Sequence, residues 1–160
     1  MRWLYQNLNI TLIMFLFPLL SNINGADFKQ NSGKLNFSEI RRQNSEIKLK
    51  VAEIIDTKEG IRNLYKVLAN KEFSKSAPIP NLINDSECLL LLKPKLKKVK
   101  FGDIEVDSLR QHGSILTVYY REIANWEYAE QKQSNPLLIL KILDRSNKIN
   151  TIKLINTPLK

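Results

Sequence analysis

The chain has 160 residues, 43% of them hydrophobic and 26% charged, which is enough for the core of one domain and too little for two ordinary ones. Its single cysteine excludes an intrachain disulfide, and its single histidine excludes a multi-histidine metal site. Five glycines form no phosphate-binding loop, so neither nucleotide-dependent catalysis nor a bound cofactor is expected. The net charge of +9 suits an anionic partner, but equally an ordinary basic exported protein, and no nucleic-acid-binding motif is present.

The first 25 residues have the order of a secretory signal peptide. Arg2 precedes an apolar run at residues 10–20, and small or polar residues follow up to Ala26. The run is about half as long as the ~20 residues that span a bilayer, and Pro18 would interrupt a core helix. We therefore expect a periplasmic or secreted protein, attached to the membrane only if the signal stays uncleaved. No cysteine lies at the end of the run, so a lipoprotein is not expected.

Residues 26–46 are polar and predict a lead-in segment with a short strand or turn near Phe37 and Ile40, and residues 47–157 predict a single domain. Alternating apolar residues at 47–55 predict a strand. Asp56, with Glu59 three residues later, resembles a capping box and predicts a helix start. An apolar face with helical spacing follows, made by Ile61, Leu64, Tyr65 and Leu68.

The remaining strands are predicted by two kinds of pattern. Residues 101–123 contain two alternating stretches around a turn at Gly113, and they predict a hairpin. Residues 88–92 and 137–143 are continuous apolar runs, typical of strands buried on both faces. Residues 149–155 alternate again, while residues 124–135 predict a long loop. This order predicts an α+β fold, a largely antiparallel sheet of five to six strands with one main helix packed on it. A small β-barrel with an accessory helix is the alternative.

Three acidic residues are the best candidates for chemistry. Asp103, Glu105 and Asp107 are spaced by two, so their carboxylates project from one face of a strand and suggest a cation site or an acid and base pair. A solvated face opposite cations such as Arg121 is the simpler interpretation, which we favour. His112 is expected in a turn and Cys88 as a buried thiol. We therefore expect no catalytic residue, no metal site and no enzyme.

Two further groups of residues are candidates for binding. A lysine cluster suggests an anion-binding site for a polymer or lipid, or else a solvated edge that discourages aggregation; it comprises Lys93, Lys95, Lys97, Lys98 and Lys100. Aromatic and turn residues suggest a contact surface for a protein partner, or else a local cover for the core. This partner-binding set comprises Phe101, Gly102, Asp103, Tyr119, Trp126 and Tyr128.

The chain resembles exported bacterial proteins that carry a PrcB C-terminal domain. The resemblance rests on residues 37–43, on residues 54–59 leading to Leu64 and Tyr65, on the proline-rich residues 78–80, and on the strands at 104–108, 116–122 and 135–139. One departure is residues 100–103, Lys-Phe-Gly-Asp, where family members often have a Gly-Gly-Tyr-like turn.

The resemblance implies a non-catalytic accessory or regulator of an exported or cell-envelope protease, with no catalytic residues to carry over. A basic envelope protein that binds an anionic polymer or lipid through the lysine cluster is the alternative. The oligomeric state is left open by the sequence.

Overall fold

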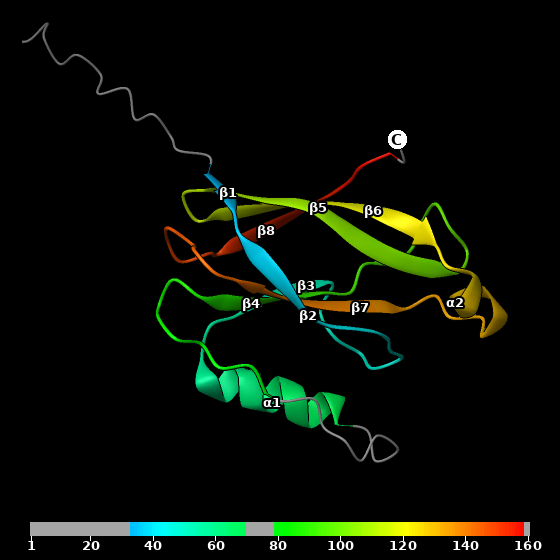
Figure 1. Ribbon diagram of the computed structural model, residues 1–160, viewed down its shortest axis with the longest axis horizontal. Helices are drawn as coiled ribbons and strands as arrows, with labels where there is room; N and C mark the ends of the chain where they lie inside the picture. The colour runs from blue at the N-terminus through cyan, green and yellow to red at the C-terminus, as the bar shows by residue number, and fades with distance from the viewer. Residues whose placement is uncertain (1–32, 70–78, 159–160) are drawn as a thin grey trace, which may run out of the picture. The chain divides into compact units, whose positions relative to one another are not determined.

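The computed structural model describes residues 33–69 and 79–158, which lie in one compact unit. They form two four-stranded sheets and two helices. Figure 1 shows three layers, with one sheet above, the second sheet in the middle and helix α1 below. The expected signal segment at residues 1–25 lies outside the described residues.

Sheet A has the strand order β1-β5-β6-β8, and sheet B has the order β2-β7-β4-β3. The strands of sheet A are β1 (Gly33–Leu35), β5 (Gly102–His112), β6 (Ile115–Ala124) and β8 (Thr151–Asn156). Those of sheet B are β2 (Phe37–Asn44), β7 (Pro136–Ile142), β4 (Cys88–Leu92) and β3 (Ala52–Ile55). Neighbouring strands are antiparallel except β6 and β8, which are parallel.

Strands β4 and β7 lie in the middle of sheet B and are buried on both faces, as their continuous apolar sequences predict. Side chains of alternate residues point to opposite faces of a strand, so each of these strands serves two cores. Leu90 and Leu140 face sheet A and belong to the inter-sheet core. Leu91 and Ile139 face the other way and pack against the helix. The middle layer thereby joins the other two.

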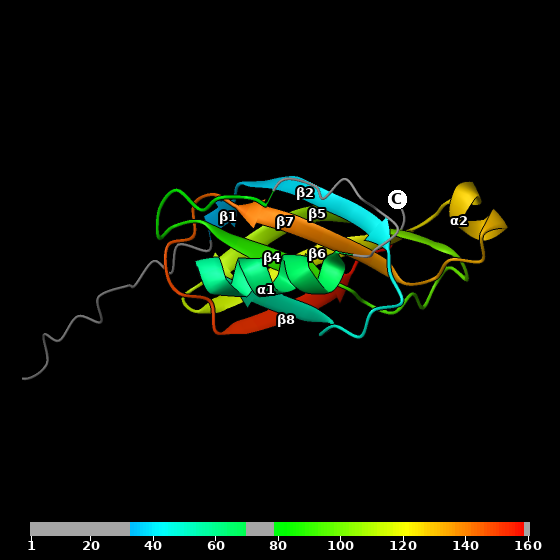
Figure 2. The ribbon, with the colours of Figure 1, turned by 90° about the horizontal axis from the view of Figure 1, so that it is seen from below.

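Helix α1 (Lys58–Leu68) covers the outer face of sheet B, as Figure 2 shows. Its buried residues are the four of the predicted apolar face, Ile61, Leu64, Tyr65 and Leu68, so that prediction is confirmed. The predicted cap is wrong, because Thr57 caps the helix and accepts a hydrogen bond from the Gly60 amide at 3.0 Å. Asp56 instead pairs with Arg145 at 3.1 Å.

Residues 33–44, predicted as part of a lead-in, form strands in both sheets. β1 pairs with β5 in sheet A, and β2 pairs with β7 in sheet B, so the chain changes sheets at Asn36. The Asn36 amide and side chain donate to the two carboxylate oxygens of Asp144, at 2.8 and 2.7 Å. These bonds fix the corner where the two sheets are joined.

The predicted single sheet of five to six strands is wrong, because the strands divide between two sheets of four. The fold is α+β in a broad sense, mostly β with few helices, and the described strands do not close into a barrel. The strand predicted at residues 47–55 contains regular structure only at β3, and the loop predicted at residues 124–135 contains helix α2 (Trp126–Glu130). Alternation along a strand defines its faces, but it leaves the sheet that the strand joins undetermined.

We predict that Leu140→Ala lowers the free energy of unfolding by about 2–5 kcal/mol, because Leu140 is 1% exposed between the two sheets and truncation leaves a cavity there. Urea denaturation followed by circular dichroism measures the loss. Ile155→Ala is the control, since Ile155 is 41% exposed. Equal losses for the two variants would contradict the assigned core.

Candidate functional site

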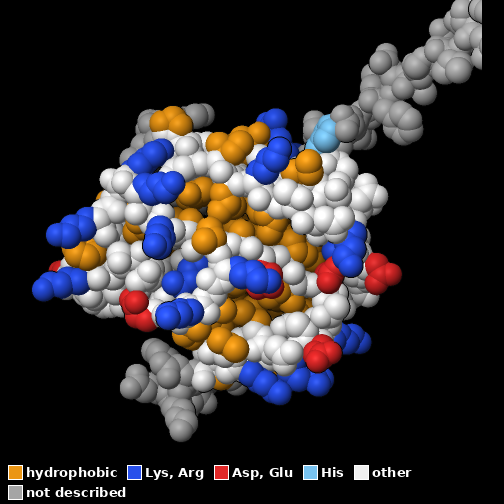
Figure 3. Space-filling view, turned by 180° about the vertical axis from the view of Figure 1, so that it is seen from behind, with side chains coloured by type: hydrophobic (Ala, Val, Ile, Leu, Met, Phe, Trp, Pro, Cys, Tyr) orange, Lys and Arg blue, Asp and Glu red, His pale blue; other side chains and the backbone are white. Residues whose placement is uncertain are grey.

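The two sheets do not meet along one side, where β3 and β8 form the edges of sheets B and A. A hollow of about 510 Å³ opens between them, and we call it the open-edge cleft. Its lining is Lys50, Val51, Ala52, Glu53, Ile54, Ile149, Asn150, Ile152 and Leu154. Six of these nine residues are apolar. Figure 3 shows apolar side chains gathered in a hollow on this face, with lysine and arginine side chains around them.

The free edge of β8 presents unpaired backbone groups toward the cleft. The amide of Thr151 donates to the carbonyl of Ser114, just before β6, at 3.2 Å, and the amide of Thr157 donates to the Tyr120 carbonyl of β6 at 2.7 Å. Because alternate residues of a parallel strand bond to the same neighbour, the N–H and C=O groups of Ile152 and Leu154 point away from β6. Within the described ranges, sheet A has no strand on that side.

Strand β3 presents a second free edge in the same way. The Lys93 amide donates to the Val51 carbonyl at 2.8 Å, and the register continues with Glu53 opposite Leu91. The backbone groups of Ala52 and Ile54 therefore point away from β4. The side chains of Ala52 and Ile54 pack against the inter-sheet core, as do those of Ile152 and Leu154. Both edges thus combine free backbone groups with inward apolar side chains.

Local sequence patterns do not reveal this site, because its two sides are about 100 residues apart in the chain. The alternation at residues 149–155 predicts a strand, and that strand is present, but nothing local indicates that it lies at an edge. One feature of the sequence does indicate an edge that can still pair. β8 contains no proline and a single lysine, Lys153, so it lacks most of the features by which exposed edges avoid pairing.

The turn at residues 101–103 is largely closed to a partner. Gly102 is buried, and a side chain there would meet the Ile123 carbonyl of β6. Asp103 is 2% exposed, and Phe101 is half-buried beneath the Lys100 ammonium, 5.3 Å from its ring centre. Glycine is therefore required here for the close approach of β5 and β6.

The aromatic members of the predicted partner-binding set are not all together. Trp126 on α2 is 70% exposed, and Tyr128 lies beside Asp103, where burial and that carboxylate raise the pKa of its hydroxyl. Tyr119 is opposite Ser108, whereas Gly102 is opposite Ala124. Five residues along β6 separate these positions by about 17 Å. Tyr119 instead stacks under Arg110 at 5.6 Å, in a separate hollow of about 470 Å³.

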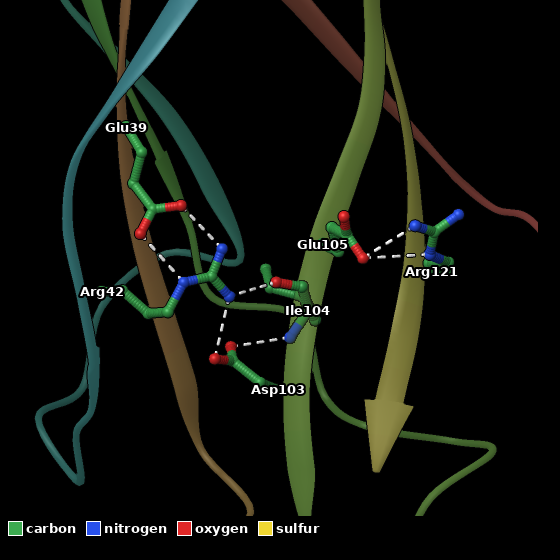
Figure 4. A network of polar contacts seen from close by, with 6 residues as sticks. All are labelled: Glu39, Arg42, Asp103, Ile104, Glu105 and Arg121. Atoms are coloured by element: carbon green, nitrogen blue, oxygen red, sulfur yellow. Dashed lines mark hydrogen bonds and ion pairs between the residues drawn. The ribbon is translucent and has the colours of Figure 1, made fainter. Parts of the chain in front are cut away.

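Arg42 of β2 reaches across to β5 and so connects the two sheets, as Figure 4 shows. Its guanidinium bonds to the Asp103 carboxylate at 2.8 Å, to the Ile104 carbonyl at 2.6 Å and to Glu39 at 2.7 Å. Asp103 also accepts the Ile104 amide at 2.7 Å. The buried carboxylate is thus paired and fully hydrogen-bonded, which is the condition for burying a charge at tolerable cost.

The predicted acidic face is divided between two arginines. Asp103 pairs with Arg42, while Glu105 and Asp107 pair with Arg121 at 2.8 and 2.9 Å. Figure 4 shows Arg42 and Arg121 on opposite sides of β5. The predicted opposition to Arg121 is confirmed for Glu105 and Asp107, and it is wrong for Asp103, which is buried and pairs with Arg42. Among the described residues no group of three or more histidine, cysteine, aspartate or glutamate side chains is placed to hold a metal ion.

The predicted lysine cluster forms a loop built around a carboxylate of the chain itself. Glu122 is 1% exposed, and its Oε2 accepts the amides of Lys97, Lys98 and Val99 at 2.7, 2.7 and 3.2 Å. Its Oε1 accepts the Asn156 side chain at 2.6 Å, so the loop is tied to β8. Lys98 donates to Asn156 and Thr157. Lys95, Lys97 and Lys100 are exposed, and Lys93 is half-buried.

The single cysteine, Cys88, and the single histidine, His112, lie in different environments. Cys88 is fully buried, and burial raises the pKa of its thiol to about 11, so the thiol stays protonated at neutral pH. His112 is the last residue of β5, next to the turn at Gly113, where φ is 58°. The predicted buried thiol is confirmed, and the predicted turn position of His112 is off by one residue.

We predict that Gly102→Ala destabilises the protein, because the new methyl group would collide with the Ile123 carbonyl. Since the backbone must move to relieve this contact, the free energy of unfolding should fall by about 1–3 kcal/mol. Gly113→Asn is the control, because that position has open space and asparagine tolerates its positive φ. Denaturant unfolding of both variants decides, and an unaffected Gly102→Ala variant would contradict the close approach of β5 and β6.

A second prediction concerns acid stability through Glu122. Burial alone would raise the pKa of this carboxyl, but the three loop amides and Asn156 outweigh burial and hold the pKa below its ordinary value of 4.5. The stabilisation is therefore complete above about pH 4.5 and is lost as the pH falls toward the lowered pKa. Glu122→Gln should lower the free energy of unfolding by about 1–3 kcal/mol near neutral pH. The difference from wild type should shrink in acid, measured by urea unfolding across pH, and a constant difference would contradict this assignment.

Comparison of the chain with protein-family models, with curated proteins and with solved structures found no match. Of the helices at residues 33–69 and 79–158, none is long and apolar enough to cross a membrane. The surface features that bear on function are the open-edge cleft, the lysine loop at residues 93–100 and the exposed side chain of Trp126.

Proposed function

We propose that this protein is an exported, non-catalytic binding module, and that it engages a protein partner at the open-edge cleft. The observation that carries the proposal is the cleft itself, in which two sheet edges offer unpaired backbone groups beside an apolar hollow of about 510 Å³. Exposed edges of this kind pair with other chains when nothing covers them. The resemblance to PrcB C-terminal domains makes an exported or cell-envelope protease the first partner to test.

The disposition of the ionisable groups supports binding over catalysis. Asp103, Glu105 and Asp107 are each neutralised by an arginine, and the Cys88 thiol is buried and protonated. Catalytic groups are normally positioned in a cleft with a pKa matched to proton transfer. The cleft here contains one acidic and one basic side chain, Glu53 and Lys50, which pair with each other at 2.6 Å.

Binding of an anionic polymer or lipid through the lysine loop is the alternative. Exposed Lys95, Lys97 and Lys100 supply charge, and the loop borders a hollow of about 530 Å³. The amides that would hold an anion most firmly are engaged by Glu122, which leaves flexible side chains alone for the purpose. Such binding would be weak and strongly dependent on salt.

A pair of valines tests the proposal. Val51 lines the cleft and is 53% exposed, whereas Val67 lies on α1 and is 51% exposed. Both accept aspartate without disturbing a core. We expect Val51→Asp to reduce capture of the native partner from envelope extracts at least about tenfold, the loss of roughly 1.4 kcal/mol of binding free energy. Val67→Asp should leave capture unchanged.

Equal capture by the two valine variants would contradict binding at the cleft. Trp126→Ala, measured in parallel, reports whether α2 adds to the contact, since Trp126 is 70% exposed. The double variant Lys95→Glu, Lys97→Glu tests the alternative. Capture that is lost in this variant alone, and that salt abolishes in the wild type, would indicate an anionic ligand instead.

A further inference from the structure

We propose that the open-edge cleft receives an extended segment of the partner, which joins β8 as an antiparallel strand. The segment places apolar side chains at alternate positions in the cleft and carries acidic residues at its ends. This inference rests on the proposed function and specifies the chemistry of the partner. It follows from the direction in which the free N–H and C=O groups of β8 point, from the lining of the cleft and from the charge around the cleft.

The four sheet edges differ in how well they are protected. β1 has three residues, and β2 has a bulge at Ile40 followed by two arginines. β3 has four residues, and Glu53 within it pairs with Lys50, three residues earlier on the same side of the cleft. β8 has six residues, no proline and no register shift against β6. Among the four edge strands of the described sheets, β8 is the longest without a register shift, so a strand adds there at the least cost.

The lining of the cleft determines the side-chain pattern of the segment. Residues that lie directly opposite in an antiparallel pair point to the same face of the sheet. Partner residues opposite Ile152 and Leu154 therefore point between the sheets, toward Ile54 and Ile149. Apolar side chains at these alternate positions would cover Ile152 and Leu154, which are half-buried in the free protein. The intervening residues face solvent.

Charge around the cleft determines the ends of the segment. Lys48, Lys50, Lys148 and Lys153 are exposed on or beside the strands that form it. The basic rim in Figure 3 and the net charge of +9 favour acidic residues where the segment leaves the cleft. A second copy of this chain would bring the same lysines and the same net charge against one another. Charge therefore favours a different protein over self-association.

A synthetic peptide tests the mode of binding without knowledge of the partner. The probe is Asp-Asp-Val-Thr-Val-Thr-Val-Asp-Asp, labelled for fluorescence anisotropy and titrated into the exported protein as the cell processes it. Its valines would lie opposite Ile152 and Leu154, with their amides toward β8. N-methylation of the valines should weaken binding about tenfold or more, because it removes the donors that face β8. N-methylation of the threonines, whose amides face away, should change affinity less than about threefold.

Four outcomes would overturn the inference. Equal effects of the two methylation patterns would show that the peptide does not bind as a strand. Unchanged affinity on replacing the aspartates with lysines would show that the segment needs no acidic residues at its ends. A protein that sediments as a dimer and dissociates on Val51→Asp would make a second copy the occupant. If the peptide fails to bind while Val51→Asp still abolishes capture of the native partner, strand addition is wrong and the proposed function stands.

Discussion

The burial of β4 and β7 on both faces is the constraint on which the rest of the structure depends. Leu90 and Leu140 contact sheet A, while Leu91 and Ile139 contact α1, so one pair of strands provides the interface for both neighbouring layers. Removal of either neighbour would expose a continuous apolar surface of the middle sheet. Sheet A needs no such double burial, and its outer face carries the ion pairs of Arg121.

Local sequence patterns predicted the features that depend only on residues close together in the chain. The continuous apolar runs at residues 88–92 and 137–143 identified the doubly buried strands, and the spacing of Ile61 to Leu68 identified the buried face of α1. The division into two sheets was not predictable in this way, because it depends on strand partners far apart in the chain. The parallel pairing of β8 with β6 is such a case, since a register between distant strands leaves no local trace.

The same distinction explains the candidate sites. Asp103 was expected on a wet face, but Arg42, 61 residues earlier, pairs with it and makes it a buried link between the sheets. The lysine cluster was a candidate for binding an external anion as well as a candidate solvated edge, but the amides of this loop are held by Glu122. In both cases the chain supplies its own counter-charge. What is left for a partner is mainly unpaired backbone and apolar surface at the edges of β3 and β8.

Amide hydrogen exchange in the native complex is the most direct measurement of the central claim, that a partner binds at the open edge. Free amides at Ile152 and Leu154 should exchange quickly in the isolated protein, because no strand of the described fold accepts them. Partner binding should slow the exchange of these two amides, while those of α2 around Trp126 should change little. Slowing confined to α2, with β8 unchanged, would contradict it.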